Sequence, residues 1–310
     1  MEFTHQPVLL WECIDGLNIR PEGVYVDGTL GRGGHSEEIA KGLTTGRLIA
    51  IDQDEQAIRE AGARLAPYGE RVTLVQGNFR DLDRILDAQE IPAVDGMLFD
   101  LGVSSPQLDD AERGFSYMND APLDMRMDTN APLTARDVVN GWTEAELKRI
   151  LWDYGEERFA GRIAGQIARV RADRPIETTL ELVEVIKSAM PAVALREKQH
   201  PAKRSFQAIR IAVNDELGAV ETLMKTAPDR LNPGGRLCII SFHSLEDRIV
   251  KNGIAARENG CTCPREAPVC TCGFVRTLRS VTRKPITAGE EELSRNPRAR
   301  SAKLRIAERV

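Results

Sequence analysis

The sequence has little of what several protein classes require. No apolar run in the 310 residues approaches the roughly 18 to 20 residues of a transmembrane helix, and the N-terminus lacks the basic start and apolar stretch of a signal peptide. Six cysteines are too few for a disulfide scaffold in a chain of this length. Four histidines and the lack of a G-x-S-x-G motif disfavour a Ser/His hydrolase. We therefore expect a cytoplasmic protein without a membrane partner.

Charge is distributed unevenly along the chain. The net charge is -5, and the 42% of hydrophobic residues can fill one large domain or two moderate ones. Residues 158–210 and 261–310 each carry 11 basic against 5 acidic side chains. These two segments favour a surface that faces a polyanion, because phosphate binding depends on the local potential. Solvated helices and tails are the other interpretation that this pattern leaves open.

The first hundred residues alternate apolar, strand-like runs with helical periodicity. This alternation predicts a parallel, doubly wound α/β sheet with right-handed crossovers. A fifth buried strand is expected within 231–241, after a Pro-Gly-Gly turn, and two closing strands at 274–281 and 302–307. The first four expected strands are 24–27, 48–52, 72–75 and 96–100, and the helices between them are 36–43, 55–65 and 82–88.

A helical segment is expected to interrupt the sheet after the fourth strand. Prolines punctuate a polar stretch there, and helical periodicity without a convincing strand follows. We therefore expect a discontinuous sheet domain of residues 1–105 and 204–310, with an all-helical insertion of residues 106–203. A long amphipathic helix over 206–223 is expected to lead back to the sheet.

A glycine-rich loop, Asp27-Gly-Thr-Leu-Gly-Arg-Gly-Gly-His-Ser36, joins the first expected strand to its helix. Its glycines allow a sharp turn and a close approach to a ligand. The G-x-G-x-x-G pattern of nicotinamide enzymes is incomplete, because Ser36 stands where the third glycine should be. Asp27 fits S-adenosylmethionine better, since that cofactor carries an ammonium, a sulfonium and a ribose but no pyrophosphate.

Two further strand ends fit an adenosyl ligand. Asp52 closes the second expected strand, where a carboxylate can accept hydrogen bonds from two ribose hydroxyls. Phe79 follows the third strand, where an adenine ring would lie. Each signal is weak alone, because a glycine cluster is often structural and a lone aromatic side chain is more often part of the core. Together they favour a nucleoside-type cofactor.

Several long motifs follow one another along the chain. They are the glycine loop and the runs 99–110, 112–116, 122–128, 154–160, 241–248 and 296–301. In these motifs the chain closely resembles the bacterial 16S ribosomal RNA cytosine-N4 methyltransferases, the MraW-like family, across nearly its whole length. The resemblance implies a class I (Rossmann-like) S-adenosylmethionine-dependent methyltransferase sheet with an inserted all-helical domain that recognises RNA.

The resemblance implies methyl transfer to the N4 of a decoding-centre cytidine, with 16S rRNA of the small ribosomal subunit as the partner. The oligomeric state stays open, with a homodimer as one option. His35 has an alternative role as a cap of the following helix, and Gln107 as a brace of the loop after the fourth strand. The cofactor-binding residues that the resemblance implies are Gly33, Gly34, His35, Asp52, Phe79, Asp100 and Gln107.

The chemistry requires a nitrogen whose lone pair is delocalised into the cytosine ring to attack a methyl group. A carboxylate and carbonyls that accept both amine hydrogens would localise this lone pair and align the attack. Asp100, at the end of the fourth strand, is the expected catalytic residue. Related amino-directed enzymes carry Asp/Asn-Pro-Pro-aromatic here, whereas this chain reads Asp100-Leu-Gly-Val103. Its role therefore stays open between cofactor and substrate contact, and no general base is assigned.

Substrate contacts are expected after the fifth strand and on the basic segments. A flipped cytosine can stack on Phe242 and hydrogen-bond to Ser241 or His243, although this run can instead cap the helix that follows. Arg204 and Arg298 are candidate contacts to rRNA phosphates, with solvated charge as the alternative.

Four of the six cysteines cluster late in the chain, as C-x-C, six residues, and C-x-C. Cys261, Cys263, Cys270 and Cys272 suit a tetrahedral zinc site, but zinc ribbons mostly use C-x-x-C. Unbound thiols and disulfides remain alternatives, and no metal ligand is assigned. Cys13 and Cys238 are interpreted as ordinary small apolar residues.

Two other function classes compete with the rRNA methyltransferase. A nonenzymatic ribosome-assembly factor predicts a degraded cofactor site, whereas the glycines and Asp52 are intact. A DNA or small-molecule amino-methyltransferase would keep the cofactor site and change the target. The resemblance, rather than the charge pattern, decides for RNA.

Overall fold

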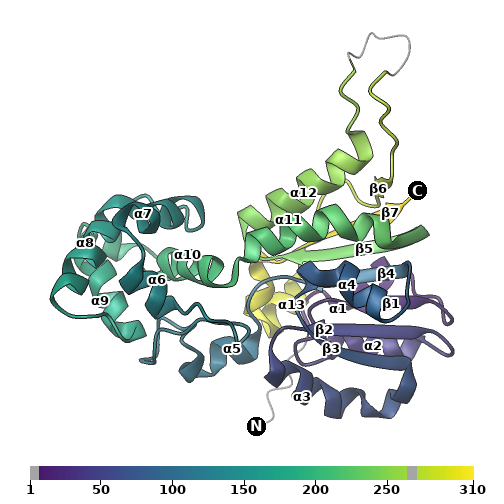
Figure 1. The fold of residues 1–310 in the computed structure, drawn as a ribbon, viewed down its shortest axis with the longest axis horizontal. Coiled ribbons are helices and arrows are strands. Elements are labelled where there is room, and N and C mark those ends of the chain that lie inside the picture. The colour runs from purple at the N-terminus through teal and green to yellow at the C-terminus, as the bar shows by residue number, and fades with distance from the viewer. Residues whose placement is uncertain (1–6, 264–270) are drawn as a thin grey trace. The chain divides into compact units, whose positions relative to one another are not determined.

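The computed structural model describes residues 7–263 and 271–310, which divide into two compact units (Figure 1). The sheet unit consists of Met1–Gly102 and Leu217–Val310. The helical unit consists of Val103–Glu216. The chain therefore leaves the sheet unit after the fourth strand and returns to it about a hundred residues later.

The sheet has seven strands within the described residues, in the order β3-β2-β1-β4-β5-β7-β6 (Figure 1). The predicted parallel arrangement is confirmed for the first five strands, whereas β7 runs antiparallel to both β5 and β6. The strand order reverses direction at β1, which lies between β2 and β4. The strands are β1 (Val24–Asp27), β2 (Arg47–Asp52), β3 (Val72–Gln76), β4 (Val94–Asp100), β5 (Leu231–Ser241), β6 (Leu278–Ser280) and β7 (Lys303–Arg309).

Both faces of the sheet are buried, which explains the continuous apolar strands. Successive side chains of a strand point to opposite faces, so Ile49 and Ile51 of β2 join one core while Leu48 and Ala50 join the other. Helices α4, α11 and α12 contribute to the first core, and α1, α2 and α3 to the second. These helices are α1 (Leu10–Leu17), α2 (Gly34–Gly42), α3 (Glu55–Leu65), α4 (Leu82–Ala88), α11 (Glu216–Thr226) and α12 (Ser244–Asn259).

The penultimate closing strand is shorter than predicted. Residues 274–277 are not part of β6, which begins only at Leu278. The Thr277 N–H donates to the carbonyl of Arg257 on α12 at 3.0 Å, and not to a neighbouring strand. The final strand, predicted at 302–307, is confirmed as β7.

The helical unit has a core of its own and extends further than the predicted insertion. Phe206, Ile209 and Val213 of α10 pack into this core, although the sequence placed them in the sheet domain. None of the helices in the described part of the chain is long and apolar enough to span a membrane. The helices are α5 (Ser105–Asp109), α6 (Ala135–Gly141), α7 (Glu144–Asp153), α8 (Ala160–Asp173), α9 (Thr179–Ala189) and α10 (Lys203–Asn214).

The single long helix predicted over 206–223 is wrong. The chain forms two helices, α10 and α11, separated by Asp215. Asp215 has a left-handed backbone with φ 47°, which ends α10 because an α-helix requires negative φ. The break coincides with the passage of the chain from the helical unit to the sheet unit.

Candidate active site at the carboxyl edge of the sheet

Three aspartates end three neighbouring parallel strands. Asp52 ends β2, Asp27 ends β1 and Asp100 ends β4, and β1 lies between the other two strands. The carboxyl ends of parallel strands meet at one edge, and ligands of α/β folds bind where the strand order reverses. The structure therefore brings these three predicted residues together at the expected place.

Asp27 is fully buried and holds the start of the glycine loop. Its Oδ2 accepts a hydrogen bond from Ser36 Oγ at 2.7 Å, and its Oδ1 accepts one from the Thr29 N–H at 3.1 Å. Burial raises the pKa of Asp27 to about 6, against the opposing effect of these two hydrogen bonds. Asp27 therefore links the glycine loop to the first turn of α2 through these two hydrogen bonds.

The glycine loop adopts a backbone that only glycine accepts easily. Gly31 has φ 51° and Gly33 has φ 75°, both in the left-handed region. At Gly33 a Cβ would also lie 3.2 Å from the Ala61 Cβ of α3. At Gly34 a Cβ would lie 2.3 Å from the Pro7 Cγ, so this glycine allows a close approach of the N-terminal segment.

Asp52 is oriented by the backbone on both of its carboxylate oxygens. Oδ2 accepts from the Gly31 N–H at 2.8 Å, and Oδ1 accepts from the Asp54 N–H at 2.9 Å. Burial raises the pKa of Asp52 to about 6 despite these hydrogen bonds. A carboxylate oxygen accepts more than one hydrogen bond, so each oxygen keeps capacity for a ribose hydroxyl.

Asp100 has the least satisfied carboxyl group of the three. Its Oδ1 is buried and has no hydrogen-bond partner among the described residues. Its backbone N–H donates to Thr29 Oγ1 at 2.6 Å, which joins the end of β4 to the glycine loop. Burial, followed by the negative charges of Asp27 and Glu246, raises the pKa of Asp100 to about 8. At neutral pH this carboxyl group is mostly protonated unless a cation lies beside it.

Phe79 and His35 contact the protein in ways that sequence reasoning did not specify. Phe79 packs against Phe99 of β4 with ring centroids 5.7 Å apart and an edge-to-face angle of 66°. His35 is buried, and its Nε2 lies 3.1 Å from the Val8 carbonyl oxygen. Gly33, and not His35, is the N-cap residue of α2.

The segment directly after β5 caps the N-terminus of α12, which is the second role that the sequence left open for Ser241, Phe242 and His243. His243 is the N-cap residue, and its Nδ1 accepts from the Glu246 N–H at 3.4 Å. The Glu246 carboxylate in turn accepts from the N–H groups of Phe242 at 2.8 Å and His243 at 3.3 Å. Ser241 Oγ lies 3.5 Å from the Lys303 carbonyl oxygen.

Glu246 is a buried acidic residue to which the sequence analysis gave no role. Its negative charge contributes to the raised pKa of Asp100, so the two carboxyl groups belong to one electrostatic cluster. A Cβ at Gly102, just after β4, would lie 3.8 Å from Glu246 Oε1. The spacing His243-x-x-Glu246 is that of a capping box, which is the signal that could have identified it.

Three predicted residues remain. Gln107 and Arg204 belong to the helical unit and Arg298 to the sheet unit. Gln107 completes a capping box at the start of α5, where its Oε1 accepts from the Ser104 N–H at 3.0 Å. Arg204 donates to the Glu156 carbonyl oxygen at 2.8 Å. Arg298 is exposed on a 3-10 helix, Pro297–Ser301, before β7.

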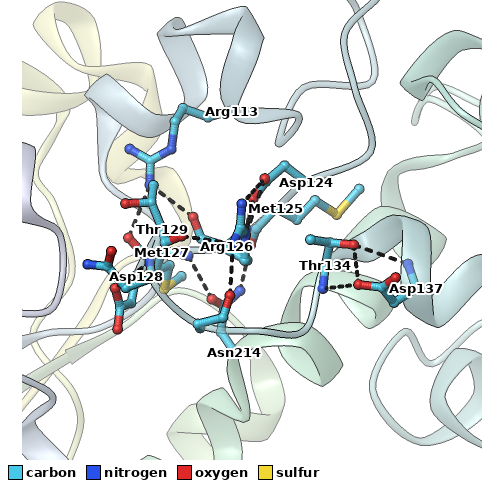
Figure 2. Close-up of polar contacts among 12 residues, drawn as sticks. Arg113, Asp124, Met125, Arg126, Met127, Asp128, Thr129, Thr134, Asp137 and Asn214 are labelled. Carbon is cyan, nitrogen blue, oxygen red and sulfur yellow. Dashed lines mark hydrogen bonds and ion pairs between the residues drawn. The ribbon is translucent and has the colours of Figure 1, made fainter.

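The motif 122–128 folds into a polar network within the helical unit (Figure 2). Arg126 and Asp124 form a two-pronged ion pair, with nitrogen-oxygen distances of 2.6 Å and 3.0 Å. Asn214, at the end of α10, donates to the Met125 carbonyl at 2.8 Å and accepts from the Met127 N–H at 2.8 Å. Asn214 was not singled out from the sequence, because it lies almost ninety residues from its partners.

The chain matches a known protein family along nearly its whole length. The family model described as the MraW methylase family matches residues 2–310. A protein of Brevibacillus brevis named Ribosomal RNA small subunit methyltransferase H is 58% identical, covering 100% of this chain and 99% of that protein. Proteins of the same name from a Paenibacillus species and Symbiobacterium thermophilum are 58% and 56% identical. They cover 99% and 98% of this chain, and the matches span 100% and 96% of those two proteins.

Proposed function

Because the chain belongs to the MraW methylase family, we propose that it methylates the exocyclic N4 of a decoding-centre cytidine in 16S rRNA of the small ribosomal subunit. Family membership confirms two predictions from the sequence, the methyltransferase fold class and S-adenosylmethionine as methyl donor. The names of the relatives support small-subunit rRNA as the substrate. The choice of base and atom rests on the motif resemblance and on the chemistry of Asp100.

The observation that carries the proposal is the buried, unpartnered Oδ1 of Asp100 at the point where the strand order reverses. A buried acceptor without a hydrogen bond is unfavourable, and it persists where a ligand supplies the partner. An exocyclic amine supplies two N–H donors. Asp100 can therefore accept one amine hydrogen and help to localise the nitrogen lone pair.

The residues at the strand ends fit the cofactor. Asp52 is oriented by two backbone N–H groups and offers its carboxylate to ribose hydroxyls, while Gly31 and Gly33 shape the loop above it. When bound, the cofactor supplies a methyl group on a positively charged sulfur. A positive charge near Asp100 favours the ionised carboxylate, so binding would lower the pKa of Asp100 from about 8.

The raised pKa of Asp100 also gives it a role after methyl transfer. The methylated nitrogen carries the positive charge and must lose a proton. Burial and the negative charges of Asp27 and Glu246 favour the protonated form of Asp100 and would make it an acceptor for that proton. Asp100 can thus take the proton that the methylated amine releases, without a separate strong base.

The helical unit and the basic C-terminal segment are proposed to bind the rRNA. Residues 158–210, all of which lie in the helical unit, carry 11 basic against 5 acidic side chains. The exposed guanidinium groups of Arg204 and Arg298 are the proposed phosphate contacts. Replacing either arginine by alanine should weaken RNA binding and reduce its salt dependence, since each phosphate contact releases condensed counterions.

The experiment that tests the proposed function follows a labelled methyl group from S-adenosylmethionine into four substrates. These are small ribosomal subunits that lack the modification, large subunits, duplex DNA and free cytidine. Label in the small-subunit rRNA alone, and its loss with Asp100→Asn, is the expected result. Transfer only to DNA or to the free nucleoside would contradict the substrate. Failure of cofactor binding would favour an assembly factor instead.

A further inference from the structure

Three cysteines separated in the sequence lie together after α12. Cys261 and Cys263 follow the end of α12, and Cys272 lies on the segment that returns to β6. The Sγ atoms of Cys261 and Cys272 are 3.7 Å apart, and the three sulfur atoms all lie within 4.8 Å of one another. Cys270 lies outside the described residues. The methyl-transfer chemistry proposed above does not use this cluster.

The sulfur separation matches a shared metal ion better than a disulfide. A tetrahedral zinc site with Zn–S bonds of about 2.3 Å places its sulfur atoms about 3.8 Å apart. A disulfide requires about 2.05 Å, much less than the 3.7 Å between Cys261 and Cys272. Thiolate sulfur is also a soft ligand, which favours zinc over magnesium or calcium.

Backbone groups around the cluster are arranged to support a thiolate. The Thr271 N–H donates to Cys263 Sγ at 3.2 Å, and the Thr271 hydroxyl lies 3.6 Å from the same sulfur. Hydrogen bonds of this kind orient metal-binding side chains and stabilise their negative charge. Gly273, directly after Cys272, has φ 68°, a left-handed backbone that lets the chain turn sharply at the cysteine.

The segment between α12 and β6 is fixed at its base, whereas its described residues 260–263 and 271–277 belong to none of the three hydrophobic cores. The Glu258 carboxylate on α12 accepts from the Ser280 N–H at 3.1 Å, from Ser280 Oγ at 2.6 Å and from Arg276 at 2.7 Å. Beyond this base, Cys261 and Cys272 are exposed. A segment that buries so little apolar surface gains stability from a bound metal.

We propose that Cys261, Cys263 and Cys272 bind a structural zinc ion. The ion joins the residues that follow α12 to the residues that lead into β6. The ion replaces a missing hydrophobic core, because it holds the segments together at a point that the hydrogen bonds of Glu258 do not reach. Each thiol loses its proton to solvent on binding, and no oxidation is involved. The site is independent of the carboxylate cluster at the strand ends.

The first test measures the metal content of the full chain. Protein purified under reducing conditions and freed of loosely bound ions is analysed for zinc, iron and copper by mass spectrometry. We expect one zinc per chain, weaker zinc binding in each single Cys→Ser variant, and none in the triple variant of Cys261, Cys263 and Cys272. Cys13→Ala is the matched control and should retain zinc, because Cys13 is buried in the core of the sheet unit.

The second test distinguishes zinc from free thiols and from a disulfide. Cobalt(II) in place of zinc should give thiolate-to-cobalt charge transfer and the strong visible bands of a tetrahedral site. The three cysteines should resist alkylation until a chelator removes the metal, as peptide mass spectrometry would show. Circular dichroism of the variants confirms that they fold. Three freely alkylated thiols with no zinc after reconstitution, a disulfide under reducing conditions, or stoichiometric iron would each overturn the proposal.

Discussion

Replacing Asp100 by asparagine should abolish turnover while stabilising the fold at neutral pH. Asparagine keeps the shape of the side chain but removes a charge that burial disfavours. The pKa of Asp100 rises from 3.8 to about 8 on folding. Above about pH 4 the carboxyl group is ionised in the unfolded chain but stays protonated in the folded one, and this difference lowers the free energy of unfolding. At 1.36 kcal/mol for each pKa unit, the Asp100 carboxyl group lowers the free energy of unfolding at pH 7 by at most about 4 kcal/mol.

The gain in unfolding free energy should be roughly 1 to 4 kcal/mol at pH 7, since the asparagine amide also needs hydrogen bonds that this site does not supply. Because the pKa of Asp100 is higher in the folded state, the wild-type protein loses unfolding free energy as the pH rises from about 4 to about 8. The advantage of the variant should therefore grow from pH 5 to pH 8 and vanish near pH 4. Hydrogen exchange of β1 and β4 in urea would report the stability of the sheet unit.

Asp247→Asn is the matched control, and its expected effect on the free energy of unfolding has the opposite sign. Burial raises the pKa of Asp247, but the Arg305 hydrogen bond and the charges of Arg305 and Lys303 outweigh it and lower the pKa. Asp247→Asn should therefore lose stability at neutral pH, with a deficit that stays constant down to about pH 4 and shrinks only as the pH falls below 3.8. If Asp100→Asn were also less stable at pH 7 than at pH 5 relative to wild type, the account of Asp100 as a strained carboxyl group would be refuted.

Three further predictions concern the cofactor and the helical unit. Asp52→Ala should weaken cofactor affinity in calorimetry but leave turnover at saturating cofactor largely intact, because Asp52 is placed to bind the ribose. From pH 7 to pH 8, above the pKa of about 6 of Asp27 and Asp52, cofactor affinity of the wild type should rise as Asp100 ionises, whereas that of Asp100→Asn should stay flat; parallel curves would contradict this. Asn214→Ala removes two hydrogen bonds of 2.8 Å to the 122–128 motif and should cost about 1 to 3 kcal/mol in helical-unit stability, measured by hydrogen exchange of α10.

Sequence patterns predicted the sheet well because its strands are buried on both faces. A short, continuous apolar run such as 48–52 is typical of a strand that is buried on both faces, and the helices between these strands have clear periodicity. The end of each strand is then fixed, so the strand pattern alone assigns Asp27, Asp52 and Asp100 to one edge of the sheet. The fold class and the carboxylates at the strand ends therefore follow from local sequence.

Features that depend on contacts between distant residues were missed. The apolar spacing from Phe206 to Leu223 continues through Asp215, so periodicity alone did not reveal the break between α10 and α11. Asn214 and Glu246 act on groups far away in the sequence. The orphaned Oδ1 of Asp100 also depends on the three-dimensional packing around it, which no spacing rule encodes.

The identity of the methylated nucleoside tests the central claim most directly. Small subunits that lack the modification are incubated with the protein and S-adenosylmethionine carrying a deuterated methyl group, and the digested 16S rRNA is analysed by nucleoside mass spectrometry. The account predicts deuterated N4-methylcytidine, which Asp100→Asn does not produce. Label at another base or atom, or undiminished label with Asp100→Asn, would contradict it.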